Sequence, residues 1–100
     1  MQTTSLTLLT VVAEAILKDR LIEEFGRAGA KGHTLIECEG SGSRHRRVGE
    51  ILGANIQLET IVSATVAEKL LDILALEYFP KFAVIAYLSP VSVIRGVKYV

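Results

Sequence analysis

The sequence predicts an α+β sandwich in which four strands and two helices follow one another in the order βαββαβ. Two observations support this prediction. Short segments rich in β-branched or alternating apolar residues are separated by two segments whose apolar residues recur every three or four positions. The length of 100 residues suits one small domain, so we expect a single ferredoxin-like domain over residues 1–100.

The first half of the chain predicts a strand, a helix and a second strand. Residues 6–12, "LTLLTVV", are short and rich in β-branched side chains, which favours a strand. Residues 14–28 form an amphipathic helical pattern that ends at two glycines, and its apolar positions are Leu17, Leu21, Phe25 and Ala28. Residues 33–39 alternate, with Thr34, Ile36 and Cys38 expected on one face of a strand.

The second half predicts a strand, a helix and a final strand. Residues 54–62 alternate clearly, with Ile56, Leu58, Thr60 and Val62 on one face. Thr65 and Glu68 have the spacing of a capping box at the start of a helix. The apolar stripe of this helix comprises Ala67, Leu70, Leu71, Leu74 and Tyr78, and Pro80 ends it. Residues 82–88 are apolar on both faces and predict a strand covered on both sides, and the tail after them has room for one more strand.

A sheet of this kind carries helices on one face only, and its other face is predicted to be apolar. We expect Leu9, Val11, Leu35, Ile61 and one side of the last strand on that open face. Half of the residues are hydrophobic, which is at the upper end for so small a domain. Another subunit should therefore cover the open face.

Charge and cysteine content exclude several classes of function. The 11 basic and 11 acidic residues balance, so general adhesion to nucleic acid is not expected. The three phenylalanines lie outside the two central strands, where an RNA-recognition domain would place its stacking aromatics. Cys38 is the only cysteine, which excludes an internal disulfide and a paired-cysteine metal site and suits a reducing cytoplasm. We expect neither a signal peptide nor a membrane span.

The stretch "GSGSRHRRVG", residues 40–49, concentrates glycines, hydroxyls and cations. Glycines let backbone N–H groups approach an anion closely, and guanidinium groups match phosphate oxygens with two parallel hydrogen bonds. The spacing is not that of a Walker A motif, and a solvated basic turn is an equally good interpretation of this loop alone. His33, His45 and Cys38 form no evident catalytic arrangement, so enzymatic function is not expected.

Read together with its flanks, this loop resembles part of a known family. The stretch "AGAKGHTLIECEGSGSR", residues 28–44, is similar to the corresponding stretch of the PII superfamily and, within it, of the SbtB-type PII-like proteins of inorganic-carbon uptake. The similarity extends to "AEAILKDRLIEEFGRAGAKG", "ANIQLETIV" and "EYFPKFAVIAYLSPV", and so covers most of the chain. It implies a PII-like homotrimer with adenine nucleotides in the clefts between subunits and a mobile T-loop at about residues 40–53.

The resemblance also implies particular site residues. Gly40, Ser41, Gly42 and Ser43 match the turn on the phosphate side, and Arg44 and Arg47 match arginines that hold the nucleotide phosphates. Arg46 is an additional cation whose role, like that of His45, is open. The adenine is expected against the backbone of Phe82, Ala83 and Val84, the ribose and base near Thr34, and a phosphate near Arg95.

The function implied is a sensor that binds AMP, cyclic AMP, ADP or ATP and inhibits an SbtA-type, sodium-dependent bicarbonate transporter. Such a protein would be cytoplasmic and held peripherally at the plasma membrane by the transporter. A divalent metal ion bound with ATP stays open. Residues 40–53 contain no tyrosine, whereas ordinary PII proteins carry a modifiable loop tyrosine, and this favours carbon over nitrogen signalling. The alternatives are a carboxysome-associated sensor with a soluble partner, and a trimeric enzyme or metal-binding protein of similar architecture.

Overall fold

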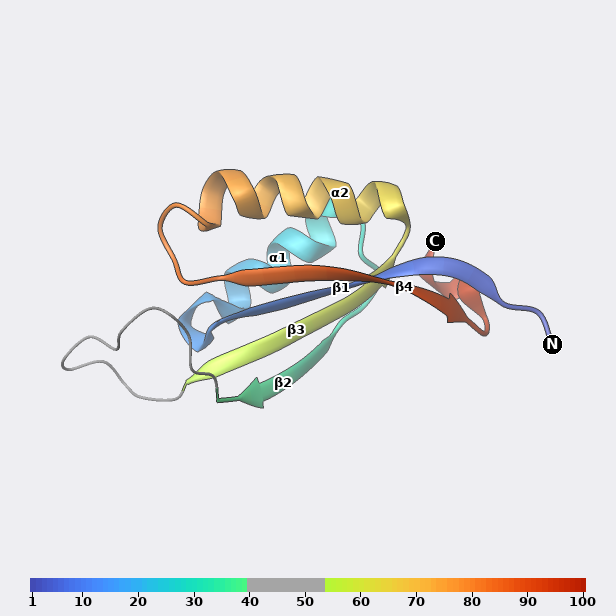
Figure 1. Ribbon diagram of the computed structural model, residues 1–100, viewed down its shortest axis with the longest axis horizontal. Coiled ribbons are helices and arrows are strands. Elements are labelled where there is room, and N and C mark those ends of the chain that lie inside the picture. Colours follow the sequence, from blue (N-terminus) through green and yellow to red (C-terminus); the bar gives the residue numbers. More distant parts are fainter. Residues whose placement is uncertain (40–53) are drawn as a thin grey trace.

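The chain forms a four-stranded antiparallel sheet with two helices packed on one of its faces (Figure 1). The structure is a computed structural model that describes residues 1–39 and 54–100. Its strands are β1 (Thr4–Glu14), β2 (Thr34–Cys38), β3 (Asn55–Val62) and β4 (Ile85–Val93), and its helices are α1 (Lys18–Ala28) and α2 (Ala64–Ile73). A 3-10 turn (Ala15–Leu17) leads into α1, and a π turn (Leu74–Tyr78) extends α2. The predicted α+β class and βαββαβ order are confirmed.

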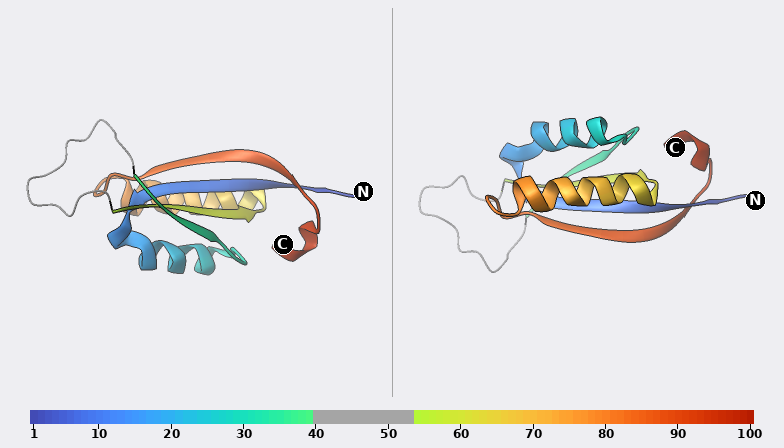
Figure 2. Two further views of the ribbon diagram at one scale, coloured as in Figure 1. Left: turned by 90° about the horizontal axis from the view of Figure 1, so that it is seen from below. Right: turned by 90° about the horizontal axis from the view of Figure 1, so that it is seen from above.

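The strand order β2-β3-β1-β4 decides which chain segments meet at each end of the sheet. Cys38 lies opposite Asn55 in the ladder between β2 and β3. Segment 40–53 therefore leaves and re-enters the described structure at one end, which is also the end where α2 connects to β4 (Figure 1). Both chain termini lie at the opposite end, and two further views agree (Figure 2).

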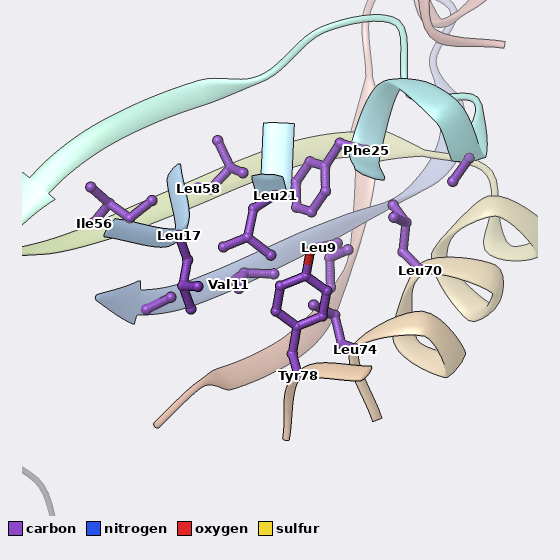
Figure 3. Packing of buried hydrophobic residues seen from close by; sticks show 12 residues of the cluster. Leu9, Val11, Leu17, Leu21, Phe25, Ile56, Leu58, Leu70, Leu74 and Tyr78 are labelled. Atoms are coloured by element: carbon purple, nitrogen blue, oxygen red, sulfur yellow. The ribbon is translucent and has the colours of Figure 1, made fainter. Parts of the chain in front are cut away.

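The core fills the space between the sheet and the helices (Figure 3). Its largest members come from both layers, and they are Leu9, Val11, Ile56 and Leu58 from the sheet and Leu17, Leu21, Phe25, Leu70, Leu74 and Tyr78 from the helical segments. Each such side chain contributes about 1.5–3 kcal/mol when it is fully buried. The predicted stripe of α1 is confirmed, and that of α2 is confirmed except that Leu71 is only half-buried.

The predicted orientation of β1 was wrong. Leu9 and Val11 are fully buried beneath the helices, because they lie opposite Thr60 and Leu58, which also face the core. Leu35 likewise lies opposite Leu58 and is not on the open face, whereas Ile61 is on it as expected. Segment 6–12 is apolar almost throughout, so its sequence carries no alternation from which the inward face could be read.

The start of α2 also differs from the prediction. Ser63, in extended conformation, is the N-cap, and its Oγ accepts a hydrogen bond from the backbone N–H of Val66 at 3.2 Å. Thr65 is already inside the helix, so Thr65 and Glu68 form no capping box at its start. The helix begins earlier because β3 ends at Val62, directly before the serine.

The final strand is displaced toward the C-terminus. β4 begins at Ile85 instead of residue 82 and continues to Val93, and the tail then forms a 3-10 turn (Gly96–Tyr99) in place of another strand. β4 is an edge strand, which accommodates Pro90 because a proline there need not donate to a second neighbour. It is not covered on both sides in the single chain, since Ile85 is 60% and Tyr87 49% exposed.

Two further properties concern the surface. Cys38 is half-buried at the end of β2. Within residues 1–39 and 54–100, no helix is long and apolar enough to cross a membrane.

Candidate functional site

The glycine- and arginine-rich part of the predicted site lies outside the described residues. It comprises Gly40, Ser41, Gly42, Ser43, Arg44, Arg46 and Arg47. The described residues fix its two anchor points, because Glu39 follows the end of β2 and Ala54 precedes the start of β3. The Ala54 carbonyl accepts a hydrogen bond from the backbone N–H of Ala15 at 2.8 Å, which ties this end of the sheet to the start of the helical layer.

Phe82, Ala83 and Val84 lie at this same end of the sheet, in the connection between α2 and β4 (Figure 1). They precede β4 and are not part of it, contrary to the expectation that they belong to a strand. The backbone N–H of Phe82 donates to the Tyr78 carbonyl at 2.9 Å, while Ala83 is exposed. The anchor points of segment 40–53 and the residues predicted to contact the adenine, distant in sequence, therefore lie at the same end of the fold.

A cleft of about 240 Å³ lies beside the same anchor points. It is lined by Ala15, Lys18, Leu35, Glu37, Ala54, Asn55 and Ile56. Both a cation and a carboxylate face it, from α1 and β2 respectively.

Thr34 lies elsewhere, in a larger cleft of about 310 Å³. This cleft is lined by Leu8, Lys31, Gly32, His33, Thr34, Glu59, Thr60, Ile61, Lys98 and Tyr99. Its wall is stabilised by the buried hydroxyl of Thr60, which donates to the Gly32 carbonyl at 2.6 Å. That bond joins the connection between α1 and β2 to the centre of β3.

Lys31, His33, Lys98 and Tyr99 are site candidates that sequence reasoning missed. The lysines give the cleft two cations against the one carboxylate of Glu59, and Tyr99 gives it an aromatic ring, so it suits a ligand with both an anionic group and a flat apolar part. Only the segment "KGHT", residues 31–34, carries a local signal, a glycine flanked by polar side chains. The C-terminal residues reach the cleft through the 3-10 turn, which the sequence did not predict.

Arg95 lies close to this second cleft along the chain but does not line it. It adopts the left-handed conformation, with φ 66°, and its carbonyl accepts a hydrogen bond from the N–H of Lys98 at 3.1 Å. Gly96 follows directly against β1, where a Cβ atom would collide with the side chain of Thr4. Arg95 thus starts the turn that brings Lys98 and Tyr99 to the cleft.

Each end of the sheet therefore holds part of the predicted site. Within residues 1–39 and 54–100, no group of three His, Cys, Asp or Glu side chains is placed to hold a metal ion. A small antiparallel α+β sandwich of this topology, with a cleft beside each end of its sheet, defines the class, a ferredoxin-like domain.

Comparison with known proteins identifies the family. The family model described as nitrogen regulatory protein P-II matches residues 6–98 of the chain. The chain belongs to this family, which confirms the resemblance to PII proteins and places it among PII-like signalling proteins.

Solved structures of the family share the whole architecture. A PII-like signalling protein from Thermus thermophilus is 52% identical and superposes with a TM-score of 0.87, with all of both chains covered. CPII from Thiomonas intermedia, bound to ADP, AMP and acetate, is 22% identical with a TM-score of 0.86 over 99% of this chain and 98% of its own. GlnK of B. subtilis is more distant, at 13% identity and a TM-score of 0.63 over 88% of this chain and 86% of its own.

Proposed function

We propose that this chain is an adenine-nucleotide sensor of the SbtB type that works as a homotrimer. The observation that carries the proposal is the separation of the predicted site residues within one subunit. Phe82 to Val84 precede β4 and Arg95 follows it, and the nine residues of β4 span about 27 Å at the usual rise per residue. A single mononucleotide cannot contact both ends in one subunit, whereas a cleft between two subunits can join one end of each.

In the proposed cleft, one subunit supplies the base of segment 40–53 and the backbone of Phe82, Ala83 and Val84. Its neighbour supplies Thr34 and Arg95, together with Lys31 and Lys98 from the larger cleft. The cations would then surround the phosphates from both sides. CPII of Thiomonas intermedia was solved with ADP and AMP, which supports adenine nucleotides as effectors.

The signal would come from the difference in charge between the nucleotides. A triphosphate presents more negative charge to Arg44, Arg46 and Arg47 than a monophosphate does, and a ligand shifts a conformational equilibrium only by its differential affinity for the two states. Segment 40–53 is the proposed contact with a sodium-dependent bicarbonate transporter of the SbtA type, which the protein would bind and inhibit at the plasma membrane.

A soluble partner is the second candidate. CPII was also solved with ADP and bicarbonate together, which favours a link to inorganic carbon without requiring a transporter. Bicarbonate uptake by vesicles containing the transporter, measured with and without this protein, separates the two candidates. Uptake that is unchanged under every nucleotide would leave only the soluble partner.

Isothermal titration with AMP, cyclic AMP, ADP and ATP, with and without Mg²⁺, tests the nucleotide site. We expect at least one adenine nucleotide to bind and GTP to bind far more weakly, since backbone groups would read the base. Arg44→Ala and Arg47→Ala should each weaken ATP binding by roughly 1.5–3 kcal/mol through loss of charge-assisted hydrogen bonds.

Adenosine is the internal control for the arginine variants, because it has no phosphate and its weak binding should not change. The loss for ATP should shrink as the salt concentration rises. Equal affinity for ATP and GTP would contradict the adenine site. Variants that bind ATP as the parent does would show that these arginines are not phosphate ligands and would favour direct contact with the partner.

A further inference from the structure

Arg20 of α1 lies over two aromatic rings. Its guanidinium carbon is 5.2 Å from the ring centroid of Tyr78 and 5.7 Å from that of Phe82. The two rings are themselves neighbours, with centroids 6.1 Å apart and planes inclined by 42°. One cation therefore contacts both the end of the α2 segment and the start of the connection to β4.

The two rings differ in how firmly the fold holds them. Tyr78 is 1% exposed and belongs to the core (Figure 3). Its hydroxyl donates a hydrogen bond to Glu24 Oε2 at 3.4 Å. Phe82 is only half-buried and packs at the edge of the core. Its backbone N–H donates to the Tyr78 carbonyl, and its ring lies beside the Tyr78 ring and below the Arg20 guanidinium. Phe82 is therefore held by the buried tyrosine and by the arginine.

Phe82 begins the three-residue segment that the proposed function assigns to the adenine base. Ala83 is exposed and Val84 half-buried, and neither has a backbone hydrogen bond to another described element outside the sheet ladder. Val84 packs against the core and Ile85 pairs with Val12 at the start of β4, so the backbone of residues 82–84 is held by that strand at one end and by Phe82 at the other. Arg20 is the group that closes over it.

We propose that Arg20 is a positioning residue that holds Phe82 against Tyr78 and so fixes the backbone of residues 82–84 for recognition of the base. The inference rests on the proposed nucleotide function, but Arg20 itself would not touch the nucleotide. A guanidinium suits this position because its charge is spread over a broad, weakly hydrated group that can lie near both rings, whereas a lysine ammonium is a compact, strongly hydrated charge.

Arg20→Ala tests the proposal through two independent readouts. The first is amide hydrogen exchange without ligand, in which Phe82, Ala83 and Val84 should exchange about three- to tenfold faster. The second is ligand binding, in which affinities for adenosine and ATP should fall by the same factor of about three to ten. Binding of inorganic triphosphate, which has no base, should stay within twofold of the parent.

Lys69→Ala is the matched control. Lys69 is exposed on α2, and Arg20 is the cation that lies over the two rings. Replacing Lys69 removes the same charge and should leave both readouts unchanged. Arg20→Lys keeps the charge but loses the planar group, so its effect should lie between those of the parent and Arg20→Ala.

The outcomes separate this inference from the function on which it rests. Unchanged exchange at residues 82–84 in Arg20→Ala would overturn the inference, whatever the protein binds. An equal effect of Lys69→Ala would also overturn it, since loss of one positive charge from the helical layer would then suffice. Failure of the parent to bind any adenine nucleotide would overturn the proposed function, while faster exchange in Arg20→Ala alone would still support the positioning of Phe82.

Discussion

Tyr78 joins the core to the candidate site, and its ionisation state matters for that role. Burial raises the pKa of Tyr78 above its usual value of 10.0, and the negative charge of Glu24 raises it further, while Arg20 acts in the opposite direction. The fold thus favours the neutral phenol, whose hydroxyl donates to Glu24.

We expect Tyr78 to make the protein sensitive to alkali. Because the pKa of Tyr78 is raised in the folded state, its contribution to stability is complete below pH 10 and is lost as the pH rises through the folded value. Urea unfolding between about pH 7 and about pH 11.5 should show the parent losing stability above pH 10 relative to Tyr78→Phe, which cannot ionise. Parallel curves for the two proteins would contradict the expectation.

At the scale of single elements, the start of α2 shows how neighbouring structure overrides a local motif. Thr65 and Glu68 match the capping-box spacing, yet the hydroxyl that accepts the Val66 N–H belongs to Ser63. The sequence could predict the helix and its buried stripe, but its first residue was fixed by where the β3 ladder ends.

The two hydroxyl residues should therefore differ in their effect on stability. Ser63→Ala should lower the free energy of unfolding by about 1 kcal/mol, since it removes the N-cap acceptor. Thr65→Ala should change stability little or raise it slightly, because alanine is the better helix former inside a helix. Urea denaturation of both variants measures the difference. A larger loss of stability in Thr65→Ala than in Ser63→Ala would contradict this expectation and support the capping box of Thr65 and Glu68.

The strands show the same division between what the sequence specifies and what it does not. The alternation of residues 54–62 correctly identified the buried face of β3, because polar and apolar side chains there differ. In β1 both faces are apolar, so the inward set of Leu9 and Val11 could be known only from the pairing with β3. In the tail, the left-handed Arg95 redirects the chain into a turn that strand propensity does not reveal.

At the scale of the whole molecule, the open face of the sheet has a revised composition. By the ladder register it carries Ile36 from β2, Ile61 from β3, and Ile85 and Tyr87 from β4. The same register also places the polar residues Gln57 and Glu59 of β3 on this face, so it is apolar only in part, and most of the residues first named for it belong to the opposite face. Among the site residues, Thr34 lines a cleft of the single chain, and Lys31 and Lys98 reach that cleft only through folding. Its contact with the ribose and base stays a prediction.

We expect the protein to sediment as a trimer at micromolar concentration. Each large apolar side chain buried between subunits contributes on the order of 1–3 kcal/mol, so Ile85→Glu should shift the equilibrium toward monomer. Ile16→Glu is the matched control, since Ile16 is 83% exposed but lies in the turn before α1, outside the sheet. A stable monomer in the parent protein would remove the intersubunit cleft and with it the proposed site.

The pairing of Cys38 with Asn55 has a consequence for how such proteins diverge. Residues 40–53 start and finish at neighbouring points of one hairpin, so the ladder that anchors them does not depend on their number or identity. Doubling the length of a connection of this kind costs only about 0.6 kcal/mol in chain entropy. Insertions, deletions and exchanges within the segment are therefore nearly neutral for folding, so its sequence can diverge between relatives while the sandwich beneath it is inherited unchanged.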